Sequence, residues 1–200
     1  MSGEADSRTR MLRTAARLLQ RQGYHATGLR QILAESGAPR GSLYFHFPGG
    51  KEQLAVDAVR AMSARIARLI AQLLAAHQDP AEAVEAFVRA FAEILHASDY
   101  AEGCPIATVT LEAAAGSPAI RAACDQAYTE WERQLRDYLV TAGVPADGAA
   151  GLATLALAAA EGGLILSRAR RDIQPLATIA AQLGAILRRA TARSGRRKRR

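Results

Sequence analysis

The chain has 200 residues, half of them hydrophobic but only 5% aromatic, and a formal net charge of +7. That length and apolar content can form a sizeable buried core, and the many alanines favour closely packed helices over a sheet. The two cysteines, Cys104 and Cys124, are too few for a disulfide framework and form no CxxC pair, so composition excludes a disulfide-rich scaffold and gives no sign of a zinc site.

Nearly every segment shows helical periodicity, and capping residues divide the chain into elements. Gly23 is expected to end the first helix, Thr27 to cap the second, and Asp79 with Pro80 to start the fifth. The segment IATVTL has strand propensity but is assigned to a short helix. The predicted helices cover residues 11–22, 28–36, 40–47, 51–77, 80–95, 105–115, 118–142, 147–171 and 175–187.

This order of elements predicts an all-α protein with three parts. A three-helix helix-turn-helix domain is expected at 1–50, and a larger helical domain at 51–192. The basic tail at 193–200 has no apolar face and is expected to be disordered. The longest apolar stretch, 148–166, is interrupted by Glu161 and four glycines, so we expect no membrane span. The polar N-terminus does not resemble a signal peptide, which predicts a cytoplasmic protein.

Positive charge gathers at the two ends of the chain. Residues 1–60 carry nine Arg or Lys against five Asp or Glu, and residues 188–200 carry eight basic residues and no acidic ones. The segment between them has nine basic and fourteen acidic residues. Basic ends are a reason to look for phosphate contacts, although a basic tail can also serve only solubility.

Residues 27–47 have the layout of a helix-turn-helix, in which the second helix enters the major groove of DNA. In that second helix Leu43 and Phe47 are expected to face inward. Arginine can contact guanine through two hydrogen bonds, and aromatic rings can pack on thymine methyls. In the alternative interpretation, Tyr44 and His46 are core residues of a small helical subdomain. The positions expected to be exposed are Arg40, Gly41, Ser42, Tyr44, Phe45 and His46.

Other residues are suited to phosphate contacts, which give affinity and register rather than sequence choice. Thr27 marks a helix start whose free amides can bind a phosphate, and Lys51 begins the long helix just after the reading helix. Arg8 and Arg10 precede the first apolar face and could reach a phosphate or the minor groove.

Residues 15–54 resemble the N-terminal domain of TetR-family transcriptional repressors. One difference is an extra residue between Phe47 and Lys51, and another is Leu33 at a position where a small residue is common. The resemblance implies base contacts from Arg40, Gly41, Tyr44 and Phe45, and phosphate contacts from Thr27, Tyr44, His46 and Lys51. The matching elements are Gly23-Tyr24, Ala26-Thr27, Ile32, Gly37, Gly41-Ser42-Leu43-Tyr44, His46-Phe47, Lys51-Glu52 and Leu54.

The segments ESGAPRGSLYFHFPGGKEQL and GCPIATVTLEAA resemble the branch of this family that contains lincomycin- and flavonoid-responsive efflux regulators. The family resemblance implies a ligand pocket in each subunit and a dimer formed by the last two long helices. The sequence is compatible with that dimer, because 148–166 is apolar nearly all round and needs partners on several sides. The second interface helix is expected to contribute Leu176, Ile179, Ala180, Leu183 and Leu187.

The ligand pocket is only loosely defined by sequence, because each candidate is also a plausible core residue. Glu112 and Glu161 are carboxylates among apolar neighbours, so each is interpreted as a structural pair or as a ligand contact. Thiol sensing by Cys104 or Cys124 is a further alternative. The pocket candidates are Phe87, Phe91, Tyr100, Cys104, Thr108, Glu112, Tyr128 and Trp131.

Enzymatic function is not expected, because the sequence contains no GxSxG, HExxH, Walker-type or GxGxxG motif. The four histidines lack metal-ligand spacing, so no catalytic residue, metal or cofactor is predicted. We expect a homodimeric repressor that binds a palindromic operator in double-stranded DNA and is released by a small, largely apolar effector. Two alternatives are a DNA-coating protein that uses the basic tail, and a small-molecule-binding protein that has lost DNA binding. The intact YFHF segment and Arg40 argue against the second.

Overall fold

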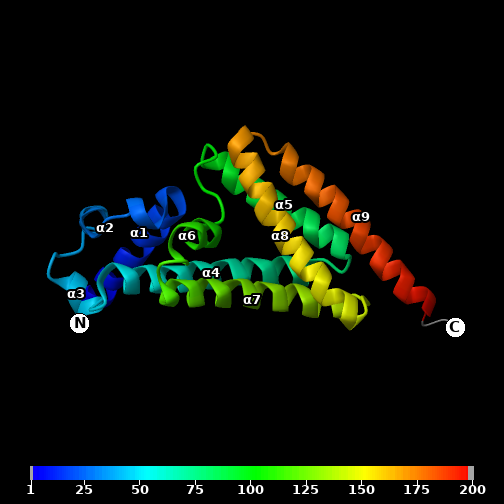
Figure 1. Ribbon diagram of the computed structural model, residues 1–200, viewed down its shortest axis with the longest axis horizontal. Helices are drawn as coiled ribbons and strands as arrows, with labels where there is room; N and C mark the ends of the chain where they lie inside the picture. Colours follow the sequence, from blue (N-terminus) through cyan, green and yellow to red (C-terminus); the bar gives the residue numbers. More distant parts are fainter. Residues whose placement is uncertain (1, 198–200) are drawn as a thin grey trace. The chain divides into compact units, whose positions relative to one another are not determined.

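The computed structural model of the chain describes residues 2–197. Within this range all regular elements are α-helices, which confirms the predicted all-α class (Figure 1). The helices are α1 (Ser2–Ala26), α2 (Leu29–Ser36), α3 (Ser42–His46), α4 (Gly50–Ala76), α5 (Pro80–Ala97), α6 (Pro105–Ala113), α7 (Pro118–Thr141), α8 (Ala146–Arg170) and α9 (Gln174–Arg197).

The segment with strand propensity, 105–113, is helical as predicted. Pro105 occupies the first turn of α6, where a missing N–H costs nothing. The β-branched residues are accommodated because Thr108 Oγ1 donates to the Cys104 carbonyl at 3.0 Å and Thr110 Oγ1 to the Ile106 carbonyl at 2.7 Å. Ile106 and Val109 are buried, so tertiary packing overrides the local preference for a strand.

The capping predictions have mixed outcomes. Asp79 accepts a hydrogen bond from the Ala81 amide at 2.9 Å and Pro80 opens α5, as predicted. The predicted cap at Thr27 is wrong, because Gly28 holds the N-cap position of α2 and no side chain caps it. Thr27 is buried, and its Oγ1 donates to the Gly23 carbonyl at 2.7 Å. At Gly23 the backbone leaves the helical conformation, as predicted, with φ of 77° and ψ of −176°, and a further helical segment follows this kink within α1.

The C-terminal helix is longer than predicted. The sequence predicts its end near residue 187 and a disordered tail at 193–200, whereas α9 extends through Arg197. A helix that is already nucleated can continue through Ala and Arg, which have high helix propensity, without an apolar face. The positive charges also favour its C-terminal end through the helix dipole. The prediction for 198–200 lies outside the described residues.

The chain divides into two compact units, each of which combines distant segments. Unit 1 consists of Met1–Arg65 and Gly103–Ala127, and unit 2 of Ile66–Glu102 and Tyr128–Arg200. This division differs from the predicted boundary after residue 50, because α6 packs on α1 and belongs with the N-terminal helices. Gln20 Nε2, for example, donates to the Gly103 carbonyl at 3.0 Å.

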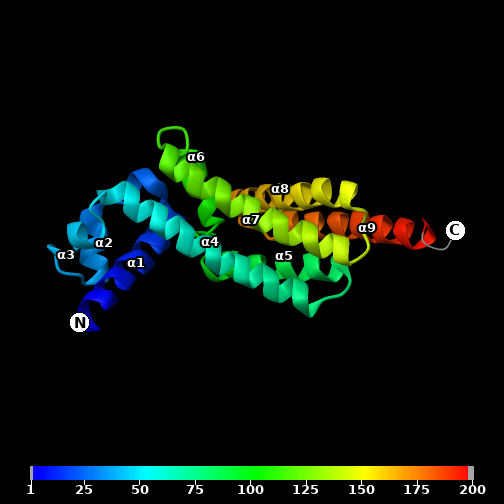
Figure 2. The same cartoon turned by 90° about the horizontal axis from the view of Figure 1, so that it is seen from below.

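In unit 2, α8 and α9 run antiparallel along one another, and α5 packs against α9 (Figures 1 and 2). The apolar stripe of α9 faces this core, so four of the five predicted interface residues are buried within the chain: Leu176, Ala180, Leu183 and Leu187. Apolar side chains are nevertheless exposed on or between the two helices: Leu155, Ile165, Leu166, Ile173 and Ile186.

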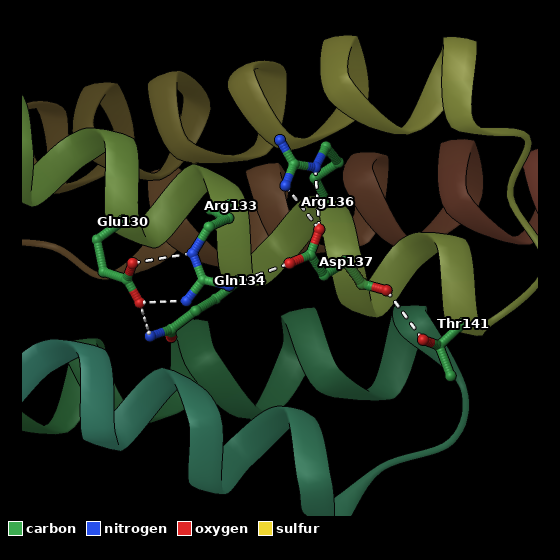
Figure 3. Close-up of polar contacts among 6 residues, drawn as sticks. All are labelled: Glu130, Arg133, Gln134, Arg136, Asp137 and Thr141. Atoms are coloured by element: carbon green, nitrogen blue, oxygen red, sulfur yellow. Dashed lines mark hydrogen bonds and ion pairs between the residues drawn. The ribbon is translucent and has the colours of Figure 1, made fainter.

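A charged network covers one exposed face of α7 (Figure 3). Arg133 Nη2 lies 2.7 Å from a Glu130 carboxylate oxygen, and Arg133 Nη1 lies 3.1 Å from Asp137 Oδ2. These are pairs three and four residues apart on a solvated helix, where solvent screening leaves each pair little effect on stability. We therefore interpret this face as an ordinary solvent-exposed surface and not as a binding site.

By length and composition alone, α8 is apolar enough to cross a membrane, which does not overturn the sequence-based expectation of no membrane span. Its most apolar 18-residue window has a mean hydropathy of 1.7, because Ala and Leu outweigh the single Glu161. A core helix of a soluble protein meets the same criterion, and Ala153, Leu157, Ala160 and Leu164 form a buried stripe on α8.

Candidate DNA-binding site

The turn between α2 and α3 is held by a side chain from α1. Gly37 ends α2 in the left-handed conformation, with φ of 62°. Arg10 Nε donates to the Ser36 carbonyl at 2.9 Å, and Arg10 Nη2 donates to the Gly37 carbonyl at 3.4 Å. This guanidinium therefore caps the C-terminus of α2, where a cation is also favoured by the helix dipole. Arg10 stabilises the turn and is not placed as a free cation for a phosphate.

Arg8 is also held within unit 1. Its guanidinium pairs with Asp57 on α4 at 2.8 Å and lies 5.4 Å from the centre of the Phe47 ring. These contacts join α1, α4 and the end of α3, which supports the orientation of the short helix. The expected reach of Arg8 toward DNA is thus replaced, in this structure, by an internal contact.

Two buried side chains anchor α3. Phe47 is fully buried and Leu43 is 2% exposed, as the spacing of four residues predicts. Ser42 Oγ donates to the Pro39 carbonyl at 2.6 Å, which fixes the start of the helix. Because α3 begins at Ser42 and not at residue 40 as predicted, Arg40 and Gly41 lie in the preceding turn.

The opposite face of α3 is aromatic and exposed. Tyr44 is 64% exposed and Phe45 is 70% exposed, so the alternative in which Tyr44 is a core residue does not hold. Arg40 and Gly41 are exposed beside them. His46 is half-buried, and its Nε2 finds no hydrogen-bond partner among the described residues. Two apolar rings that face water, rigidly supported from behind, are typical of a recognition surface.

The start of α2 offers main-chain donors together with an arginine that sequence reasoning missed. Thr27 is buried and its hydroxyl is engaged, so a phosphate at this helix start would meet main-chain amides and not the Thr27 side chain. Arg30, in the first turn of α2, is exposed. Arg30 could have been found from its position in the helix. It does not share a face with the buried Ile32, so its side chain points to solvent.

Lys51, predicted to contact a phosphate, lies against α1. Its Nζ donates to the His25 carbonyl at 3.3 Å and lies 4.4 Å from the centre of the Tyr24 ring. Burial lowers the pKa of Lys51, and the nearby Glu112 carboxylate offsets part of that change. Lys51 is half-buried, so its ammonium is positioned by the protein before any ligand arrives.

Glu112 joins α6 to the kink of α1. Its carboxylate accepts a hydrogen bond from the His25 amide at 3.0 Å, and the His25 ring Nε2 lies 3.0 Å from the Glu112 carbonyl. The carboxylate occupies the space beside Gly23, where a Cβ atom would lie 1.8 Å from Glu112 Oε1. Glu112 therefore positions the end of α1 within unit 1 and does not line a ligand pocket in unit 2.

A separate cavity lies within unit 2. Including the part open to solvent, it has a volume of about 690 Å³. Its walls come from α4, α5, α7, α8 and α9, with contributions such as Leu73, Phe87, Leu135, Ala160 and Leu183. The lining is apolar apart from the Tyr138 hydroxyl, which matches the general character of small-molecule pockets.

Of the eight predicted pocket residues, only Phe87 lines this cavity. Phe91 packs behind it, with ring centres 4.6 Å apart, and Tyr128 packs edge to face on the buried Trp131. The sequence interpretation favoured aromatic and polar residues, whereas the cavity walls are mostly aliphatic side chains from five helices. The remaining four candidates do not line it: Tyr100, Cys104, Thr108 and Glu112.

Both cysteine thiols are buried, and neither forms a disulfide. Burial raises the pKa of the Cys124 thiol, so a smaller fraction is present as reactive thiolate at neutral pH. We therefore expect both thiols to react with Ellman's reagent at pH 8 at least about a hundredfold more slowly in the native protein than in guanidinium chloride, because reaction requires unfolding. Rapid reaction of one thiol in the native protein would contradict this expectation and support thiol sensing.

Sequence comparison assigns the N-terminal helices and the larger C-terminal part of the chain to one family. Residues 11–58 match the family described as "Bacterial regulatory proteins, tetR family", and residues 80–182 match the "Transcriptional regulator LmrA/YxaF-like, C-terminal domain". The HTH-type transcriptional regulator LmrA of Bacillus subtilis (strain 168) is 41% identical over 92% of this chain and 98% of its own length. The chain belongs to the TetR family of transcriptional regulators.

Two further comparisons agree with this TetR-family assignment. The uncharacterized HTH-type transcriptional regulator YxaF of Bacillus subtilis (strain 168) is 39% identical over 94% of this chain and 99% of its own length. The crystal structure of the regulatory protein TetR from Rhodobacter sphaeroides covers 88% of this chain and 96% of its own, with a TM-score of 0.80 and 22% identity. The second comparison shows the shared fold alone.

Members of the TetR family are transcriptional regulators and not enzymes, which agrees with the absence of catalytic motifs. TetR-family regulators bind DNA as dimers, respond to small-molecule effectors, and act on DNA in the cytoplasm. The match of residues 80–182 to the LmrA/YxaF-like C-terminal domain also agrees with the predicted branch. It favours a regulator over a protein that coats DNA without sequence preference.

Proposed function

We propose that this protein is a ligand-responsive repressor that binds a palindromic operator as a homodimer and dissociates when a small, largely apolar effector binds. The observation that supports the proposal most directly is the exposed pair Tyr44 and Phe45 on α3, fixed from behind by the buried Leu43 and Phe47. A soluble protein gains nothing from two exposed rings on a five-residue helix unless a partner covers them.

In the proposed complex α3 enters the major groove. Arg40 and Gly41 lie in the turn that leads into it, where an arginine can reach guanine and a glycine permits close backbone approach. Tyr44 and Phe45 contact base edges, and Ser42 and His46 lie at the margins of the same surface. Phosphate contacts come from the amides at the start of α2 near Thr27, from Arg30 and from Lys51.

The second copy is proposed to pack on α8 and α9. The exposed Leu155, Ile165 and Leu166 on α8 and Ile186 on α9 form part of an apolar surface that a monomer would leave in water. A twofold dimer places two α3 helices on one face of DNA, and recognition of a palindrome requires them about 34–36 Å apart, one helical turn.

Effector and operator are proposed to favour different states of this dimer. Since α4 contributes residues to both units, a ligand that displaces its second half can change the position of its first half. Ligand and DNA then oppose each other with a coupling free energy that is typically about 1–3 kcal/mol.

The function is tested by titrating the full chain into a labelled duplex from the region upstream of its own gene, at about 150 mM salt. We expect nanomolar affinity and a preference over a scrambled duplex of about a thousandfold or more. Equal binding of both duplexes would be followed by selection of bound fragments from the whole genome. If no fragment is enriched there either, the chain is not a sequence-specific repressor.

Replacing Arg30 by alanine is expected to weaken binding to operator and scrambled DNA by the same factor, about fivefold, and to reduce the salt slope by about one. The reason is that a phosphate contact carries no sequence information. Arg89→Ala, which removes an exposed arginine from α5 in unit 2, is the matched control and should leave both affinities unchanged. A loss confined to the operator would instead assign Arg30 to a base contact.

A further inference from the structure

Lysine is rare in this chain, and one lysine lies at the proposed DNA-binding site. Of the 26 Lys or Arg residues, only Lys51 and Lys198 are lysine, and Lys51 is the one within the described residues 2–197. An arginine guanidinium binds its partners in a rigid planar fork, whereas a lysine ammonium is a compact charge on a flexible stem. The start of α4 therefore carries a cation that can exchange one partner for another.

The Lys51 ammonium is held by the end of α1. Its Nζ donates to the His25 carbonyl at 3.3 Å and lies 4.4 Å from the centre of the Tyr24 ring, whose face attracts a cation. We call the His25 carbonyl and the Tyr24 ring the lysine seat. These contacts use the same N–H donors that a phosphate would accept from, so the lysine seat competes with DNA for this ammonium.

Glu112 on α6 fixes the lysine seat from the other side. Its carboxylate accepts a hydrogen bond from the His25 amide at 3.0 Å, so the N–H and the C=O of His25 are bound by Glu112 and by Lys51 respectively. The His25 ring Nε2 lies 3.0 Å from the Glu112 carbonyl, which restrains the same residue a second time. The position of the lysine seat therefore depends on a residue outside the helix-turn-helix.

The charge of Glu112 acts in the same direction as its hydrogen bond. Burial lowers the pKa of Lys51 and the Glu112 carboxylate raises it, which shows that the carboxylate attracts the ammonium. The same negative charge repels a phosphate that approaches Lys51. Both effects favour the seated ammonium over one that contacts DNA.

We propose that Glu112 is a positioning residue for DNA binding, which holds the Lys51 ammonium in the lysine seat and thereby limits the affinity of its phosphate contact. The proposal rests on the proposed function, because that function assigns a phosphate contact to Lys51. A phosphate contact carries no sequence information, so Glu112 limits binding to every duplex. A residue that only supported the fold would have the opposite effect, since its replacement would weaken binding.

Removing the charge of Glu112 tests the sign of this effect. Glu112→Gln keeps the length of the side chain, and its amide oxygen can still accept from the His25 amide. With the full chain, we expect operator and scrambled duplexes to bind about fivefold more tightly at about 50 mM salt and less than about twofold more tightly at about 300 mM, where exposed charges are screened. Weaker binding of either duplex overturns the proposal.

The matched control is Asp125→Asn, which removes an exposed carboxylate from α7, also in unit 1. Asp125 has no role in the lysine seat, so its replacement should change both affinities by less than about 1.5-fold at the same salt concentrations. If Asp125→Asn tightens binding as much as Glu112→Gln does, the gain reflects net charge alone and the positioning role is wrong.

A double-mutant cycle tests whether Glu112 acts through Lys51. Lys51→Met keeps an apolar stem without the charge and is expected to weaken binding of both duplexes by the same factor, about tenfold. In that background Glu112→Gln should tighten binding less than about twofold, because no ammonium remains to be released. An undiminished gain would show that the carboxylate acts on DNA directly, which overturns the positioning role.

NMR of the wild-type chain follows the ammonium without relying on a variant at Glu112. Reductive methylation with isotope-labelled formaldehyde marks lysines and keeps their positive charge, and Lys51→Met identifies the Lys51 signal. That signal is expected upfield of its position in urea-unfolded protein, because the Tyr24 ring shields it, and to move downfield when scrambled duplex is added to saturation. A signal that stays upfield in the complex overturns the exchange between lysine seat and phosphate.

The same measurements separate this inference from the proposed function. If Glu112→Gln tightens both duplexes through Lys51 but wild type shows no preference for any operator, the positioning role stands and the sequence-specific repressor fails. If wild type prefers its operator but Glu112→Gln does not tighten binding, the positioning role fails and the repressor stands.

Discussion

Replacing Tyr44 by alanine is expected to lower affinity for the operator about 10- to 100-fold and affinity for a scrambled duplex less than about threefold. The ring is 64% exposed, so its removal leaves the core intact while deleting contacts to base edges. Fluorescence anisotropy with both duplexes at about 150 mM salt measures the two affinities. Circular dichroism should show unchanged helix content and melting temperature within about 2 °C.

The matched control is Leu111→Ala. Leu111 is 79% exposed on α6, also in unit 1, and is not part of the proposed DNA-binding surface. Its replacement should leave both affinities unchanged. If Tyr44→Ala retains full operator preference, α3 does not read the sequence and the proposed recognition surface is wrong.

Replacing Gly23 by alanine is expected to destabilise the protein by about 2–4 kcal/mol, for two separate reasons. First, φ of 77° with ψ of −176° lies in a region that almost only glycine adopts, at a cost of about 1–3 kcal/mol for a residue with a Cβ atom. Second, the new methyl group would overlap the Glu112 carboxylate, whose nearest oxygen lies 1.8 Å from the Cβ position. Displacing that carboxylate breaks its hydrogen bond to the His25 amide.

The Glu112→Ala background isolates the first reason. There Gly23→Ala should cost less than in the wild-type background, because the overlap is gone and only the backbone cost remains. Gly37→Ala is a comparison in the left-handed helical region: Gly37 has φ of 62° and ψ of 20°, no heavy atom lies within 4 Å of its Cβ position, and its replacement should cost about 1–2 kcal/mol. Urea unfolding of these variants measures the differences. Equal losses for Gly23→Ala in the two backgrounds would show that the overlap with the carboxylate contributes nothing.

Local signals in the sequence were enough to predict which side chains of α3 are buried and which are exposed. Leu43 and Phe47 are separated by one helical turn, so their shared burial and the exposure of Tyr44 and Phe45 follow from helix geometry. The cap at Asp79 was predictable for the same reason, since donor and acceptor are two residues apart. Interactions of this range depend on the order of residues and on helix geometry alone.

Contacts between distant segments were not predictable in this way. Arg8 and Arg10 were expected to face DNA, but Asp57 and the end of α2 engage them across 49 and 26 residues. Glu112 was interpreted as a structural pair or as a ligand contact, and its spacing gave no sign that its partner is His25, 87 residues away. A side chain with several possible partners contacts the one that packing brings nearest. The spacing of residues in the sequence does not indicate that distance.

The sequence by itself determined the all-α class, the membership of the TetR family, and the face of α3 that meets solvent, because each depends on periodicity or on a contiguous motif. Tertiary structure alone decided which surface covers the apolar stripe of α9, which residues line the cavity in unit 2, and that α6 packs with the N-terminal helices. An amphipathic helix specifies that one stripe must be covered, but the covering surface is selected by the packing of the whole chain.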